Sequence, residues 1–147
     1  MTPIQDLFKE YEQTHRHPVN QMFHMICIPF LVWSVLGVLW SFKISYGGLI
    51  NGATIVVPLA ILYYSTFSRQ LAFILFLVGA VMLTFCAYFD RHSLLVLLSI
   101  IVFFLSWTGQ LVGYHFEGMR PTFFRDLQFL LIAPIWIMAR LLMIPLH

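Results

Sequence analysis

Histidine and amide side chains gather in the first of two polar stretches within an otherwise apolar sequence. His15, His17, Asn20 and His24 lie close together there, and Pro18 stands between the second histidine and the asparagine. Proline is favoured at the first position of a helix. In a helix that begins at Pro18, Asn20 and His24 share one face. Polar side chains at the start of an apolar helix should face a protein interior or water rather than lipid.

The second polar stretch ends a later apolar segment. Gln110, Tyr114 and Glu117 recur at helical spacing and therefore share a face, while His115 lies about 100° around the helix. Arg120 follows just beyond them. The second stretch thus adds an imidazole, a carboxylate and a guanidinium group to the imidazoles of the first.

Two or three imidazoles and one carboxylate that meet at one place could hold a catalytic metal ion. Such a ligand set with open positions suits a non-haem Fe(II) that activates oxygen, or a catalytic zinc. A structural zinc site would require thiolates, but Cys27 and Cys86 lie inside apolar stretches and are expected to pack there. The sequence therefore predicts a catalytic rather than a structural metal.

The elements that must position these residues are membrane helices. Of 147 residues, 61% are hydrophobic and 10% are charged, whereas soluble domains carry about 25% charged residues. A membrane-crossing helix needs about 20 mostly apolar residues. We expect one integral membrane domain over residues 1–147, an all-α polytopic bundle of about five transmembrane helices preceded by an interfacial helix near residues 3–16. The expected spans are residues 24–42, 48–64, 71–89, 94–114 and 128–146.

Five spans would bring the two polar stretches to the same membrane face, because four crossings separate them. The expected N-terminal face carries Lys9, Arg16, Arg69, Arg120 and Arg125, and the other carries Lys43, Arg91 and Arg140. The positive-inside rule then places the N-terminus and the site in the cytoplasm. We expect a multipass protein of a bacterial inner membrane or an endoplasmic reticulum membrane. The net charge of +2, with basic residues scattered singly, excludes a nucleic-acid partner.

Both polar stretches resemble motifs of one membrane family. His15-Arg16-His17-Pro18-Val19-Asn20, followed by His24 and Ile28-Pro29, is similar to the N-terminal motif of the 2-hydroxy fatty acid dioxygenases, which act in fatty acid α-oxidation during phytosphingosine breakdown. His17 stands where that family has Asn. The second motif is matched by Trp107, Gln110, Gly113, His115, Glu117 and Arg120-Pro121, with Ala133-Pro134 in the last span.

The resemblance implies an Fe(II)-dependent dioxygenase that uses O2 to remove one carbon from 2-hydroxy fatty acids, without 2-oxoglutarate. It implies iron ligands at His15, His24 and His115, with Glu117 as a fourth ligand or as a partner of the ligands; His17 is a further candidate ligand. The candidate substrate-binding residues are Arg16, Asn20, Gln110, Tyr114 and Arg120.

Two other interpretations stay open at this point, as does the oligomeric state. Zinc competes for the same ligands, so a zinc-dependent lipid hydrolase is the first. The second is a non-catalytic scaffold or small transporter, in which histidines bridge water and headgroups and Glu117 pairs with Arg120. A transporter would place polar groups near the bilayer midplane, whereas Thr54 and Thr84 are among the few mid-span polar side chains here.

Overall fold

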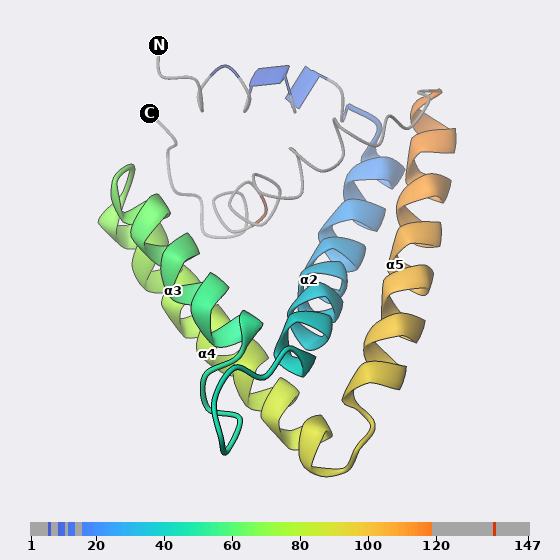
Figure 1. Cartoon of the computed structure of the whole chain (residues 1–147). Helices are drawn as coiled ribbons and strands as arrows, with labels where there is room; N and C mark the ends of the chain where they lie inside the picture. The colour runs from blue at the N-terminus through green and yellow to red at the C-terminus, as the bar shows by residue number, and fades with distance from the viewer. Residues whose placement is uncertain (1–5, 7–8, 11, 14–15, 119–136, 138–147) are drawn as a thin grey trace. The chain divides into compact units, whose positions relative to one another are not determined.

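The structure is a computed structural model, and it describes residues 6, 9–10, 12–13, 16–118 and 137. These residues form helices joined by short loops. Four helices have their full bounds in this part of the chain (Figure 1): α2 (Pro18–Ser41), α3 (Gly52–Ser65), α4 (Arg69–Arg91) and α5 (Leu95–Glu117). These residues contain no strand, only an isolated β-bridge between Lys43 and Asn51. The expected all-α fold is confirmed for the described residues.

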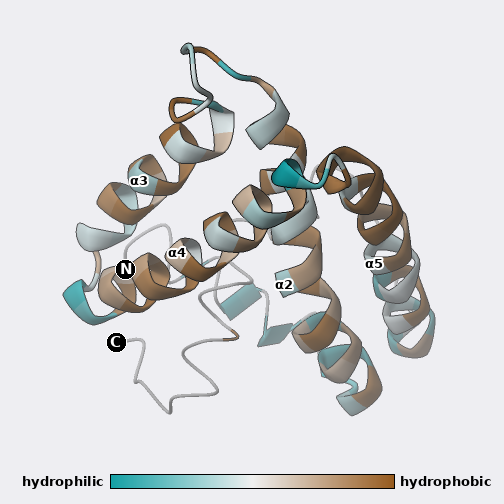
Figure 2. Cartoon of the chain, turned by 90° about the horizontal axis from the view of Figure 1, so that it is seen from below, coloured by the Kyte–Doolittle hydropathy of each residue, from teal (hydrophilic) through white to brown (hydrophobic). Residues whose placement is uncertain are grey.

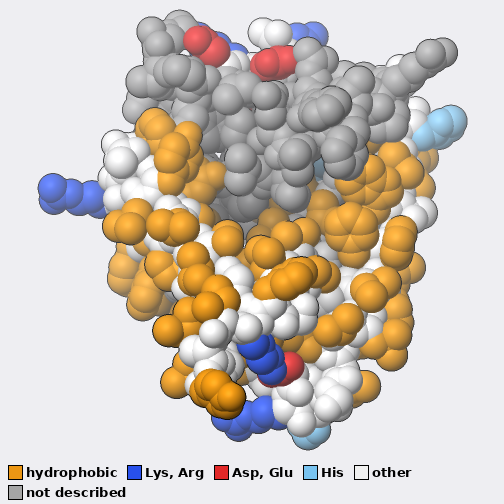
Figure 3. Space-filling view, in the orientation of Figure 1, with side chains coloured by type: hydrophobic (Ala, Val, Ile, Leu, Met, Phe, Trp, Pro, Cys, Tyr) orange, Lys and Arg blue, Asp and Glu red, His pale blue; other side chains and the backbone are white. Residues whose placement is uncertain are grey.

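Three of these helices are long and apolar enough to cross a membrane. Helices α2, α4 and α5 have 24, 23 and 23 residues, and at a rise of about 1.5 Å per residue each exceeds the hydrocarbon thickness of about 30 Å. Figure 2 colours most of their residues as hydrophobic, and Figure 3 shows hydrophobic side chains over much of the described surface on one face. They correspond to the expected spans at residues 24–42, 71–89 and 94–114. Helix α2 begins at Pro18, as the proline predicted.

Helix α3 is shorter than the second expected span, residues 48–64. It has 14 residues and begins at Gly52, because Asn51 caps it. The Asn51 Oδ1 accepts hydrogen bonds from the backbone N–H groups of Ala53 and Thr54, both at 3.1 Å. The Thr54 hydroxyl in turn accepts from the Asn51 N–H at 2.9 Å. A helix of this length spans about 21 Å, less than the hydrocarbon core of a bilayer.

Two expected elements fall mostly outside the described residues. In the expected fifth span, residues 128–146, only Ile137 is described, and it is helical and buried. Arg16, the last residue of the expected interfacial helix, is not helical. Within that expected helix the described residues with helical backbone are Asp6, Lys9, Glu10, Glu12 and Gln13.

The contacts divide the chain into two compact units, which we describe separately. Unit 1 comprises residues 1–31 and 104–147, and unit 2 comprises residues 32–103. In unit 1 the start of α2 packs closely against the end of α5 at two glycines. A Cβ atom on Gly109 would lie 2.5 Å from the Cys27 sulfur, and one on Gly113 would lie 2.6 Å from Asn20 Oδ1. Small residues four positions apart let two helices approach each other closely.

Unit 2 is held together by apolar packing between helices. Its buried core consists of Leu36, Ala53, Cys86 and Leu95. Helix α3 packs along α4, and Gly79 of α4 leaves room for a side chain of α3. Cys86 is a free thiol with no exposed surface, so its expected packing role is confirmed.

Candidate active site

Polar side chains from both predicted stretches are buried in unit 1. Asn20 and His24 on α2 are 0% and 2% exposed, and Tyr114 and Gln110 on α5 are 6% and 8% exposed. The helix faces inferred from the spacing are therefore the faces turned inward. Burying polar groups among apolar helices is costly unless they are hydrogen-bonded, so their hydrogen bonds are informative about what this region can do.

The backbone selects one tautomer of the neutral His24 ring. Its Nδ1 lies 3.0 Å from the Asn20 carbonyl oxygen, and a carbonyl oxygen can only accept a hydrogen bond. Nδ1 therefore carries the proton, and in the neutral ring Nε2 carries the lone pair that can bind a metal ion or accept a proton. The Tyr114 ring packs edge-on against the imidazole, with centroids 5.0 Å apart. Metal-binding histidines are commonly oriented by such a bond to a carbonyl.

Glu117 joins the end of α5 to the start of α2. Its Oε1 accepts from the Arg16 backbone N–H at 2.9 Å, and its Oε2 accepts from the His17 backbone N–H at 2.8 Å. Oε2 also accepts from the Asn20 side-chain amide at 3.0 Å. The first N–H groups of a helix lack partners within it, and negative charge is favourable at that end. Glu117 thus caps α2 from a position about one hundred residues later in the chain.

The contact with Glu117 also orients the Asn20 amide. Because its Nδ2 donates to the carboxylate, its Oδ1 must point the other way, toward Gly113. This Oδ1 and the Gln110 Nε2 are buried and have no hydrogen-bond partner among the described residues. Leaving a buried polar atom unpaired costs about 1–3 kcal/mol. The Asn20 Oδ1 is an acceptor and the Gln110 Nε2 is a donor.

The two other described histidines of these stretches are arranged differently. His17 is half-buried, stacks on the Phe116 ring at 5.9 Å, and accepts through Nδ1 from the Val19 N–H at 3.3 Å. It therefore acts as the N-cap residue of α2. His115 is exposed, and its ring lies 6.2 Å from that of Phe116. The buried aromatic residue at the end of α5 is Tyr114, one position earlier.

The metal ligands predicted from the sequence lie only partly within the described residues. Among them no group of three His, Cys, Asp or Glu side chains is placed to hold a metal ion, and His15 and Arg120 lie outside them. His24 suits a ligand role because of its tautomer and burial. Both oxygens of Glu117 already accept hydrogen bonds from the backbone of residues 16 and 17, just before α2, which suits an orienting role better than that of a ligand. Arg16 is exposed at the entry to α2.

Sequence reasoning missed two contributors to this region. Ser106 is 5% exposed and lies one helical turn before Gln110, so the same spacing argument could have included it. The capping role of Glu117 left no local signal, because its partners are backbone N–H groups far away in the sequence.

Comparison with known proteins shows a family match over nearly the whole chain, including both polar stretches. The sequence model of the family described as 2-hydroxy-palmitic acid dioxygenase Mpo1-like matches residues 1–144. No curated protein and no solved structure matches the chain. The family match covers both motifs that carried the resemblance, together with most of the residues that the structure does not describe. The chain therefore belongs to the 2-hydroxy-palmitic acid dioxygenase Mpo1-like family.

Proposed function

We propose that this protein is a membrane-embedded, Fe(II)-dependent dioxygenase that uses O2 to remove one carbon from 2-hydroxy fatty acids. The observation that carries the proposal is the family match over residues 1–144. The family name points to a 2-hydroxy fatty acid as substrate. The buried polar groups of unit 1, which lie on two apolar helices long enough to cross a membrane, support the proposal independently.

The chemistry of the substrate suits these side chains. A 2-hydroxy fatty acid has a head with a carboxylate and a neighbouring hydroxyl, and a long apolar tail. The Asn20 Oδ1 is available to accept from the hydroxyl, and the Gln110 Nε2 is available to donate to the carboxylate. Arg16 or Arg120 would pair with the carboxylate from the rim of the site. The tail would lie against the apolar surfaces of the helices, where it is already in a lipid-like environment.

The iron ligands we propose are His15, His24 and His115. When bound, Fe(II) with open coordination positions would activate O2 and hold the carboxylate and hydroxyl of the substrate. The Asn20 carbonyl would keep the lone pair of His24 on Nε2. Glu117 would act by holding the start of α2 and the Asn20 amide in place. Tyr114 would pack against the His24 ring and keep its orientation.

The direct test incubates the purified protein with ferrous iron, O2 and 2-hydroxypalmitic acid. We expect a fatty acid one carbon shorter, detected by mass spectrometry, and no product from His24→Ala. The same variant should also contain less iron after anaerobic purification, which is a measurement independent of turnover. His92→Ala is the matched control, because His92 is exposed and lies in unit 2. Full turnover by His24→Ala would remove this residue from the site.

The metal content separates the proposal from its zinc alternative. Stoichiometric zinc in the anaerobically purified protein, together with no O2 consumption, would instead favour a hydrolase. A protein that binds neither metal and forms no product would contradict any catalytic role.

A further inference from the structure

The segment between α2 and α3, residues 42–51, turns its large apolar side chains outward. Tyr46 is fully exposed at 109%, and Leu49 is exposed at 83%. The segment contains one charged residue, Lys43, and no acidic residue. Contiguous apolar side chains on a surface mark a site of interaction with a protein or a membrane. The exposed apolar members of this segment are Phe42, Ile44, Tyr46, Leu49 and Ile50.

The same segment satisfies most of its own backbone hydrogen bonds. The Ile44 N–H donates to the Ile50 carbonyl at 2.9 Å, and the Gly52 N–H donates to the Phe42 carbonyl at 3.1 Å. The Ser45 hydroxyl accepts from the Ile50 N–H, and its carbonyl accepts from the Gly48 N–H. The N–H groups of residues 42–45, 48 and 50–52 all donate in this way. In a poorly hydrated environment, backbone groups must find such internal partners.

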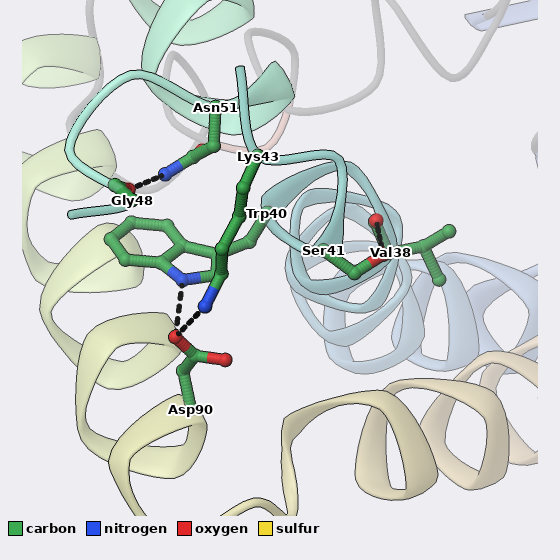
Figure 4. Close-up of polar contacts among 7 residues, drawn as sticks. All are labelled: Val38, Trp40, Ser41, Lys43, Gly48, Asn51 and Asp90. Atoms are coloured by element: carbon green, nitrogen blue, oxygen red, sulfur yellow. Dashed lines mark hydrogen bonds and ion pairs between the residues drawn. The ribbon is translucent and has the colours of Figure 1, made fainter. Parts of the chain in front are cut away.

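Its single charge is neutralised where the segment meets α4. The Lys43 ammonium donates to Asp90 Oδ2 at 2.6 Å, and the Trp40 indole N–H donates to the same oxygen at 3.1 Å (Figure 4). The Lys43 stem lies against Gly48, where a Cβ atom would be 3.3 Å from the lysine Cδ. Gly48 also has a positive φ of 72°, which favours glycine. The folded segment therefore presents an apolar surface while its charged group stays paired.

The length of α3 indicates where this surface lies. Its 14 residues reach about 21 Å, roughly 9 Å short of the hydrocarbon core of a bilayer. The segment continues α3 at its N-terminal end, which is also the end where the long helix α2 finishes. Apolar side chains at this place would supply the hydrophobic length that α3 lacks.

We propose that residues 42–51 form an interfacial loop whose apolar side chains insert among the phospholipids at the boundary of the bilayer. Phospholipid is the partner that fits, because the loop is apolar, carries no unpaired acidic charge, and adjoins helices of membrane length. Phe42 and Tyr46 are aromatic, and tyrosine is enriched at membrane–water interfaces. The proposal does not depend on the enzymatic function.

The test compares two nitroxide labels at the same end of unit 2. Tyr46→Cys places one on the loop, and His92→Cys places the other at the C-cap of α4, beyond Asp90. The full-length protein is reconstituted in phosphatidylcholine vesicles. Collision rates are then measured with O2, which dissolves in the bilayer, and with a water-soluble nickel chelate. The unsubstituted chain is labelled in parallel to correct for Cys27 and Cys86.

We expect the ratio of O2 to nickel accessibility to be several-fold higher for the label at residue 46 than for the label at residue 92. Equal, water-favouring ratios would overturn the proposal. A label at residue 46 shielded from both reagents would also overturn it, because the loop would then be covered by protein, such as a second copy of the chain. Leu49→Cys repeats the test at a second exposed position in case the first variant does not fold.

Discussion

At the scale of single residues, the arrangement around Glu117 is the clearest structural result. One carboxylate accepts hydrogen bonds from two backbone N–H groups and one side-chain amide, all from the start of α2. The motif resemblance had left its role open between a metal ligand and a partner of the ligands. Hydrogen bonds to charged groups contribute about 1.5–3 kcal/mol each, so this carboxylate should matter for stability.

We therefore predict that Glu117→Gln lowers the thermal stability of the detergent-solubilised protein. The amide would turn one N–H donor toward the N–H donors of α2, and the loss should be about 1–3 kcal/mol. Differential scanning fluorimetry measures the shift, and Glu12→Gln, at an exposed position, is the control. If Glu117→Gln had the same melting temperature as Glu12→Gln, the capping role would be wrong. Normal iron content in a destabilised Glu117→Gln would support an orienting role over a ligand role.

At this scale the sequence predicted which side chains are buried better than it predicted their contacts. Helical spacing correctly grouped Asn20 with His24 and Gln110 with Tyr114, because the spacing alone determines which residues share a face. The exposed position of His115 also follows from its place about 100° around the helix. Hydrogen bonds between side chains and distant backbone groups leave no periodic pattern, so the contacts of Glu117 could not be predicted.

At the scale of the elements, α2 and α5 approach each other closely at two glycines of α5. Gly109 faces Cys27, and Gly113 faces Asn20 and His24. The second glycine matters for the site, because a side chain there would displace the Asn20 amide from Glu117. The first is suited to a test that leaves the polar groups untouched.

Gly109→Ala should destabilise the packing of α2 against α5, and Cys27→Ala should restore it. The added methyl would lie 2.5 Å from the Cys27 sulfur, an overlap that typically costs about 1–3 kcal/mol, more than alanine gains over glycine in helix propensity. Removing the sulfur leaves the methyl 3.9 Å from the Cys27 Cβ, an ordinary contact. A double-mutant cycle on melting temperatures measures the coupling. Additive effects of the two substitutions would show that the helices do not meet there.

The bounds of the long helices were predicted better than those of α3, and the reason is physical. Long apolar stretches gave α2, α4 and α5 nearly complete, because hydropathy averages over a whole span. The start of α3 was predicted too early, because hydropathy averaged over many residues does not detect a single N-cap residue. Asn51 with Thr54 three residues later is a capping pair visible in the sequence, and reading it would have shortened the expected span.

At the scale of the whole molecule, the exposed apolar surface indicates that the protein lies in a membrane. Three helices of 23 or 24 residues have a mean hydropathy of 2.1 to 2.4 over their most apolar windows, and large hydrophobic side chains are exposed on all of them. Exposed apolar surface of this extent marks contact with a membrane or with another protein, and the length of the helices favours the membrane. The membrane character inferred from composition is therefore confirmed at this level.

We predict that the protein stays in the membrane pellet after washes with high salt and with alkaline carbonate, and dissolves only in detergent. Salt and alkali remove proteins held by charge, whereas apolar helices of this length stay in the hydrocarbon. Immunoblots of pellet and supernatant give the measurement, and a peripheral protein of the same membrane is the control. Release by carbonate would contradict the integral character of the chain.

The short length of α3 has one more consequence, which concerns the host bilayer. Its 14 residues do not reach across the hydrocarbon core alone, so the hydrophobic match there depends on the apolar side chains of residues 42–51. Each ångström of lipid thickness beyond their combined reach would add a mismatch cost of a fraction of a kcal/mol. We therefore expect thickening of the bilayer, by sterol or by longer acyl chains, to strain this part of the protein before it affects the longer helices.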